Sequence, residues 1–133
     1  MDNDLWMWFD FGDADLESAE HLLTMHRLRL EIICYHCQQA VEKYLKGFLY
    51  YHGILPPKIH ELDKLCHMCA EVDVRFEAIY DECEALSDYS IQPRYPHEMY
   101  LEERHMKKAL EYARKIKEFA PLQEVREMLN GLK

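Results

Sequence analysis

The sequence predicts an all-α protein, an up-and-down four-helix bundle with a short extra helix and a helix at the C-terminal end. Apolar residues recur every three or four positions in five successive segments, as they do on one face of a helix. The 133 residues include only 4 glycines and 5 prolines, and few breakers favour long helices. No segment shows the alternation of apolar and polar residues that predicts a strand.

The first predicted helix covers about residues 13–26. Its apolar stripe and the acidic residues near its start are typical of an amphipathic helix, in which Asp13 or Asp15 would accept from free backbone N–H groups. An aromatic lead-in precedes this segment and is expected to pack back onto the bundle. The lead-in consists of Trp6, Trp8, Phe9 and Phe11.

The second predicted helix is the longest and covers about residues 28–52. At ~1.5 Å per residue it sets the height of the bundle at ~35–40 Å. Gly53 is well placed to end it, and Pro56 and Pro57 prevent its continuation. Its apolar stripe consists of Leu30, Ile33, Cys34, Cys37, Val41, Tyr44, Leu45 and Phe48.

Shorter helices are predicted over about residues 61–71 and 74–89. Residues 92–96 then form a break in which two prolines bracket Arg94 and Tyr95 and fix an extended corner. The last long helix is predicted over about residues 100–119, and Pro121 separates it from a short helix over 122–129. Residues 1–133 are therefore expected to form one domain with a core over about 8–118 and an extension over 121–133.

Composition restricts the classes of function. The formal net charge of −9 argues against a domain that coats duplex DNA non-specifically, because that requires clustered Lys and Arg. No apolar run approaches the length of a membrane span, and the acidic start does not resemble a secretory signal. The five cysteines are therefore expected to be reduced thiols in a cytoplasmic protein.

Three short segments carry a family resemblance. They are CYHCQQAVEKYLK at 34–46, HELDKL at 60–65, and Tyr89 through Pro96, which ends in the Arg94-Tyr95-Pro96 triplet. In this order and spacing the segments resemble the HEPN domain family. The resemblance implies a helical bundle, homodimers, and nucleotide binding or RNA-directed activity. Many bacterial and archaeal members resemble toxins or partners of a small nucleotidyltransferase, in pairs of the toxin–antitoxin kind.

The ribonuclease members of that family carry an Arg, four to six residues and then a His in the region of the last long helix. This sequence departs from that pattern. His97 follows Arg94 after two residues and His105 follows after ten, while Arg104 directly precedes His105. The departure puts autonomous RNA cleavage in doubt and leaves Arg94, His97 and His105 as weak catalytic candidates. On an apolar face, His105 is more typical of a satisfied core or interface residue.

Arg94 and Tyr95 lead the candidates for ligand binding. A guanidinium matches phosphate oxygens and a neighbouring aromatic ring can stack on a base, so the rigid corner would present both groups to a nucleotide. In the alternative, Arg94 pairs with a carboxylate and Tyr95 packs at the end of the bundle. Tyr89, His60 and Lys43 are further candidates, because the family resemblance covers all three.

Gln38 and Gln39 lie beside the apolar stripe of the second predicted helix. Paired amides at this position are expected to bond another helix or a dimer mate rather than a ligand.

Two Cys-x-x-Cys pairs resemble the halves of a four-thiolate zinc site. They are formed by Cys34 with Cys37 and by Cys66 with Cys69. The first pair lies mid-helix on the stripe that faces the core, where cysteine commonly acts as a small apolar residue. We therefore expect no zinc and no other cofactor.

Three functions remain open on the sequence. The first is a homodimeric module that binds a nucleotide or RNA, or docks a nucleotidyltransferase. The second is a toxin-like endoribonuclease with an atypical Arg/His site, and the third is a purely structural assembly subunit.

Overall fold

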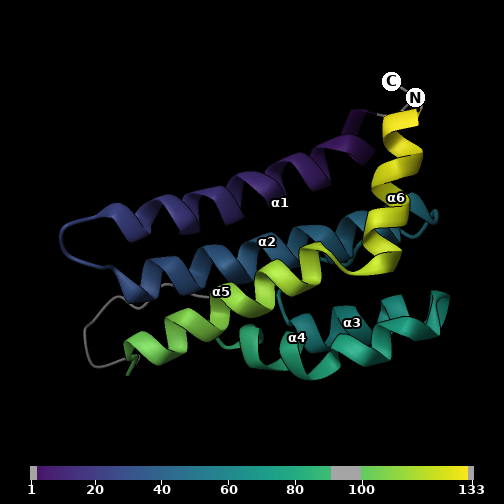
Figure 1. The fold of residues 1–133 in the computed structure, drawn as a ribbon. Helices are drawn as coiled ribbons and strands as arrows, with labels where there is room; N and C mark the ends of the chain where they lie inside the picture. The colour runs from purple at the N-terminus through teal and green to yellow at the C-terminus, as the bar shows by residue number, and fades with distance from the viewer. Residues whose placement is uncertain (1–2, 91–99, 132–133) are drawn as a thin grey trace.

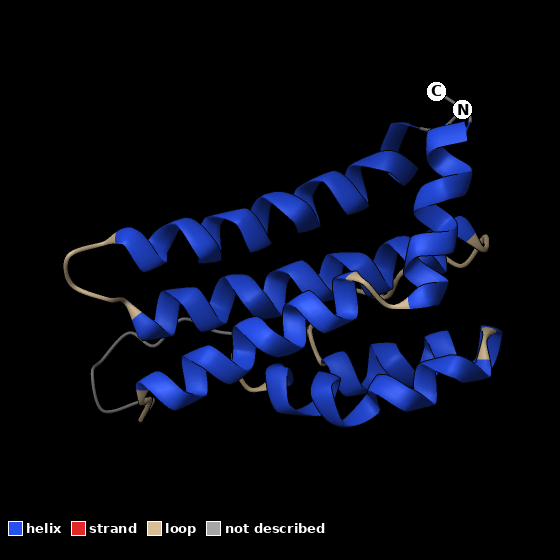
Figure 2. Cartoon of the chain, in the orientation of Figure 1, coloured by secondary structure: helices blue, strands red, loops and turns tan. Residues whose placement is uncertain are grey.

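The structure, a computed structural model, describes residues 3–90 and 100–131 (Figure 1). Within these ranges it contains helices and loops and no strand (Figure 2). The α-helices are α1 (Asn3–His21), α2 (Leu30–Tyr51), α3 (Leu62–Val72), α4 (Tyr80–Ser87), α5 (Glu103–Lys117) and α6 (Ala120–Gly131). Two 3₁₀ helices, η1 (Leu22–Thr24) and η2 (Val74–Ile79), follow α1 and α3. The predicted all-α bundle is confirmed.

Helix α2 is the central element of the bundle. Helix α1 lies along one side of it, α3 and α4 lie on the other side, and α5 passes beside it (Figure 1). Thirteen of its residues are buried, including Tyr44, Leu45 and Leu49, so most of its surface faces other helices. The bounds agree with the predicted 28–52 to within two residues. Gly53 follows its C-cap with a φ of 77°, a backbone conformation that favours glycine.

Helix α1 begins ten residues before the predicted start. The aromatic residues at 6–11 belong to the helix rather than to a lead-in, and Asp13 and Asp15 lie in its middle, not at its N-terminus. In the sequence, Asp13 and Asp15 resemble the acidic residues of a helix N-terminus. In the structure, their side chains contact residues of other helices instead. The helix also ends at His21 rather than His26, because η1 replaces its last predicted turn.

Two glycines allow α1 to approach α2 closely. A Cβ atom on Gly12 would lie 2.6 Å from Cε1 of Tyr44, and one on Gly47 would lie 2.8 Å from Cε2 of Phe9. Any larger residue at either position would force these ring side chains or the helices themselves to shift. The tight α1–α2 pair therefore depends on glycines on both helices.

The later helices differ from the prediction at their boundaries. The segment predicted as one helix over 74–89 divides into η2 and α4, and Asp73 caps η2 by accepting from the backbone N–H of Arg75. Helix α5 begins at Glu103 rather than Tyr100, because Glu102 is its N-cap. Pro121 is the second residue of α6, where its missing N–H costs nothing.

An ion pair fastens α6 across the α1–α2 pair. The Arg126 guanidinium donates to both carboxylate oxygens of Asp13, over 2.9 and 2.6 Å, and lies 5.3 Å from the ring centres of Phe9 and Tyr44. The Tyr44 hydroxyl also donates to Asp13, over 2.7 Å. Burial raises the pKa of Asp13, but the hydrogen bonds from Arg126 and Tyr44 outweigh burial and hold that pKa below its ordinary 3.8.

In the part of the chain that the structure describes, no helix combines the length and the apolar character that a membrane crossing requires.

Replacing Arg126 by Ala is expected to destabilise the fold at pH 7. The loss is about 1–3 kcal/mol, since a partly buried carboxylate loses its main partner. The depressed pKa of Asp13 stabilises the fold above about pH 4, and this contribution disappears as the pH falls towards the folded pKa. The deficit of Arg126→Ala should therefore shrink at pH 3. Urea unfolding at the two pH values measures both effects.

Arg114→Ala is the matched control, because the 3.6 Å ion pair that Arg114 forms with Glu20 is exposed. A deficit of Arg126→Ala that is no larger than that of Arg114→Ala would contradict the role given to the Asp13–Arg126 pair.

Candidate functional site

A surface cavity of about 280 Å³ lies between α4 and α5. One wall is the C-terminal end of α4 with Tyr89, and the other is the first three turns of α5. The lining residues are Ala85, Leu86, Tyr89, Arg104, His105, Lys108, Ala109 and Tyr112. Two cationic side chains, an imidazole and two phenol rings thus surround an apolar floor.

The N-terminus of α5 orients His105. Glu102 and His105 form a capping box, in which the backbone N–H of Glu102 donates to Nδ1 of His105 over 2.9 Å. Because Nδ1 accepts this bond, the proton of the neutral imidazole lies on Nε2. His105 is therefore a half-buried capping residue with a satisfied ring nitrogen.

The two cations of the cavity have only weak internal partners. Nε of Arg104 lies 3.3 Å from Glu102, and Nζ of Lys108 lies 3.3 Å from Glu111 and 5.7 Å from the ring centre of Tyr112. All these charged groups are exposed, and exposed ion pairs contribute little to stability. Both cations can consequently turn towards an anion in the cavity at little cost.

Specific contacts hold the α4 wall in place. Glu82 of α4 accepts from Lys115 of α5 over 2.6 Å, which ties the two walls together. The hydroxyl oxygen of Ser87 accepts from the backbone N–H of Leu62, which fixes the end of α4 to the start of α3. Burial raises the pKa of Tyr89, so its phenol is neutral at physiological pH and can donate or stack.

A comparison with protein-family models matches residues 5–125 to the HEPN domain. The match covers most of the chain. The chain belongs to the HEPN family. No curated protein and no solved structure matches the chain. Membership indicates a function related to nucleotides or RNA, as the resemblance implied.

Some of the residues predicted for a ligand site lie outside the described residues. Arg94, Tyr95 and His97 belong to 91–99, so their part in a site stays a prediction. This segment joins the two walls of the cavity in sequence. Of the predicted residues that the structure describes, Tyr89 and His105 meet in the cavity, whereas Lys43 and His60 do not line it.

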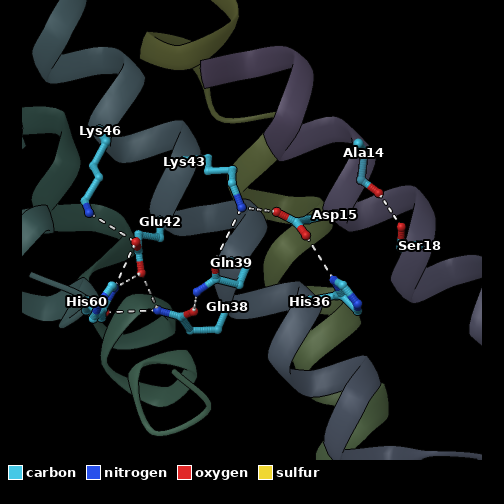
Figure 3. Close-up of polar contacts among 10 residues, drawn as sticks. All are labelled: Ala14, Asp15, Ser18, His36, Gln38, Gln39, Glu42, Lys43, Lys46 and His60. Carbon is cyan, nitrogen blue, oxygen red and sulfur yellow. Dashed lines mark hydrogen bonds and ion pairs between the residues drawn. The ribbon is translucent and has the colours of Figure 1, made fainter. Parts of the chain in front are cut away.

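Lys43 lies on the side of α2 that faces α1 (Figure 3). Its ammonium group donates to Asp15 and, over 3.4 Å, to the amide oxygen of Gln39. The other oxygen of Asp15 contacts Nδ1 of His36 at 2.9 Å. Lys43 is thus part of a contact between α1 and α2.

His60 and Gln38 join a second polar cluster, which connects α2 with the segment before α3 (Figure 3). The buried amide nitrogen of Gln38 donates to Glu42 and to the backbone oxygen of His60, over 3.1 and 3.0 Å. Glu42 also accepts a hydrogen bond from the Lys46 ammonium group over 3.1 Å, and its carboxylate lies 3.1 Å from Nδ1 of His60. Gln39 donates to the oxygen of Gln38 over 2.8 Å. Both glutamines therefore have hydrogen-bond partners within the same chain.

The five cysteines are buried free thiols. Burial, reinforced by Glu31, raises the pKa of Cys34 to about 12, and burial also raises the pKa of Cys37 and Cys69. Cys66 and Cys69 donate to the backbone oxygens of Phe76 and Leu45. The described residues contain no group of three His, Cys, Asp or Glu side chains arranged to hold a metal ion.

Arg104, Lys108 and Tyr112 line the cavity but were not predicted as site residues from the sequence. Their spacing of four residues places them on one stripe of α5, and this was the available signal.

His105 variants test the capping role. His105→Ala removes the acceptor for the Glu102 N–H and should destabilise the fold by about 1 kcal/mol. His105→Gln provides a side-chain oxygen at the same position of the capping box and should retain most of that stability. Urea unfolding of both variants measures the difference, and equal losses would contradict the capping box.

Proposed function

We propose that this HEPN domain binds a nucleotide or a short stretch of single-stranded RNA in the cavity between α4 and α5. The observation that carries the proposal is the cluster of Arg104, His105 and Lys108 around the cavity with two tyrosines, in a chain of net charge −9. A basic cluster on an acidic protein marks a local site for an anion and not a general affinity for nucleic acid.

Each kind of side chain matches one part of a nucleotide. Arg104 provides a planar donor fork and Lys108 a point charge for phosphate oxygens. The phenol rings of Tyr89 and Tyr112 provide faces on which a base can stack, which is worth about 1–3 kcal/mol per base. The volume of about 280 Å³ is at the lower end of the range for small-molecule sites.

Arg94 and Tyr95 are proposed to complete the site, because their segment links α4 to α5 in the sequence. Lys43 and His60 are excluded from the proposal. Each makes contacts elsewhere on α2, and neither lines the cavity.

A pair of lysine variants tests the cavity. Lys108→Ala should weaken the binding of a fluorescent oligoribonucleotide about tenfold and reduce the slope of log K against log salt by about 0.7, the loss of one phosphate contact. Lys107→Ala removes the same charge from the next residue, which does not line the cavity, and should change neither quantity. Fluorescence anisotropy at several salt concentrations provides both measurements.

Equal losses in the two lysine variants would show that net charge alone attracts the ligand and would contradict the cavity. Failure of the parent protein to bind any nucleotide or oligoribonucleotide would favour the purely structural subunit.

An endoribonuclease is the second candidate, and the orientation of His105 favours it. The capping box occupies Nδ1 of His105 and leaves Nε2 as the nitrogen that can exchange a proton with RNA, and the form that acts as a general acid for the leaving oxygen is the imidazolium ring. Arg94 and His97 are the proposed further members of such a site. His105→Gln, which keeps the cap, should then abolish the cleavage of cellular RNA by the purified protein. Cleavage that survives this variant would exclude His105 as the acid.

The proposed setting is cytoplasmic, with a homodimer and a nucleotidyltransferase-type protein as partners. Family membership supports this setting through the resemblance described above. Co-purification of this chain with a nucleotidyltransferase expressed beside it tests the second partner.

A further inference from the structure

A pair formed by a carboxylate and a histidine lies just before α3, outside the cavity between α4 and α5. Nδ1 of His60 is 3.1 Å from each carboxylate oxygen of Glu42 (Figure 3). The two side chains differ in exposure, since 65% of the His60 side chain is exposed but only 8% of the Glu42 side chain. The pair therefore joins a buried carboxylate to an imidazole ring at the surface.

The other partners of Glu42 determine which ring nitrogen of His60 carries the proton. Glu42 accepts hydrogen bonds from the Lys46 ammonium group and from the amide of Gln38, each over 3.1 Å. A carboxylate that faces an ammonium group only accepts hydrogen bonds, so Nδ1 of His60 must donate to it. The lone pair of the neutral ring then lies on Nε2, on the side of the ring away from Glu42. Because the ring is largely exposed, this lone pair is open to a reagent in the solvent.

The surrounding hydrogen bonds hold both members of the pair in place. The amide of Gln38 that donates to Glu42 also donates to the backbone oxygen of His60, over 3.0 Å. The backbone N–H of His60 donates to the Glu61 carboxylate over 3.1 Å. The imidazole is thus oriented before any reaction, and an oriented nucleophile loses less freedom on the way to the transition state.

The other described histidines have different surroundings. Nδ1 of His105 accepts a hydrogen bond, so Nε2 of that neutral ring carries the proton and has no free lone pair. His36 has a carboxylate at Nδ1, but only 27% of its side chain is exposed. The rings of His52 and His67 pack against aromatic rings. Within the described residues, His60 combines a carboxylate at Nδ1 with a largely exposed ring.

We propose that His60 is a phosphorylation site, at which Nε2 takes the phosphoryl group of a small acyl phosphate. The Nε2 lone pair forms a bond to phosphorus, the P–O bond to the acyl group breaks, and the acyl carboxylate leaves with the bonding electrons. The ring becomes an imidazolium whose positive charge faces the Glu42 carboxylate, as in other pairs of a carboxylate and a histidine. Nδ1 then loses its proton to water, which leaves a neutral phosphohistidine ring.

The start of α3 provides partners for the added phosphoryl group. His60 directly precedes Glu61, the N-cap of α3, whose side chain makes no capping hydrogen bond. A helix N-terminus favours negative charge. Lys64 lies in the first turn and forms an exposed 3.9 Å pair with Glu61, which it can exchange for a phosphoryl oxygen at little cost. The Glu61 and Asp63 carboxylates oppose the new charge, so neutralising Glu61 should not slow the reaction.

Incubation of the full-length chain with acetyl phosphate, followed by mass spectrometric peptide mapping, tests the proposal. His60 should gain a phosphoryl group at least about tenfold faster than His67 of the same molecule, because Glu42 stabilises the imidazolium at His60. The exposed ring of His67 packs against Tyr80 and provides the internal control. The modification should be labile in acid and stable in base, which distinguishes phosphohistidine from a phosphate ester and from an acyl phosphate.

Two variants test the part of the buried carboxylate. Glu42→Gln keeps an oxygen that can accept from Nδ1 but removes the negative charge, so it should slow the modification of His60 at least about tenfold and leave that of His67 unchanged. Glu61→Gln is the matched control, because Glu61 contacts the backbone N–H of His60 and not its ring. It should be modified at least as fast as the parent. Circular dichroism shows whether each variant folds, and the ratio of His60 to His67 in the parent decides the question if Glu42→Gln does not.

A parent in which His60 is unmodified, or is modified no faster than His67, would overturn the proposal. A folded Glu42→Gln variant that is modified as fast as the parent, or equal losses in Glu42→Gln and Glu61→Gln, would do the same. The proposal does not rest on the nucleotide site, because neither Glu42 nor His60 lines the cavity between α4 and α5.

Discussion

The burial of α2 among the other helices is the constraint on which the rest of the structure depends. A helix surrounded in this way must find partners for its polar groups inside the protein. Gln38 and Glu42 find them at His60 and thereby fix the segment that leads into α3. The first turn of α3 in turn holds Ser87 at the end of α4. A chain of contacts thus runs from the buried face of α2 to the wall of the cavity.

The segment at 34–46, which resembles the HEPN family, makes contacts within the bundle. Its glutamines, Glu42 and Lys46 bond one another and the segment before α3, whereas Lys43 contacts α1 (Figure 3). The chemistry of the proposed site comes instead from α5, where Arg104 and Lys108 concentrate positive charge on an otherwise acidic chain. The two parts are linked because Lys115 of α5 reaches Glu82 of α4.

Periodicity predicted the long helices well, because the buried face of α2 repeats at helical spacing over its whole length. It failed at α1, since Asp13 resembles a cap in the sequence while its real partner, Arg126, lies 113 residues away. The site was predicted only in part. Tyr89 and His105 were named, but Arg104 and Lys108 were not, because only the packing of α4 beside α5 turns their stripe into a cavity wall. A single sequence does not show that α4 and α5 pack side by side.

The proposed ligand site lies between α4 and α5. Amide chemical shifts of the isotope-labelled protein, recorded while a nucleoside monophosphate or a short oligoribonucleotide is added, test this claim most directly. We expect saturable shifts at the cavity residues, such as Ala85 and Ala109, with little change along α1. Shifts concentrated on α1, or at Lys43 and His60 instead of the cavity, would contradict it.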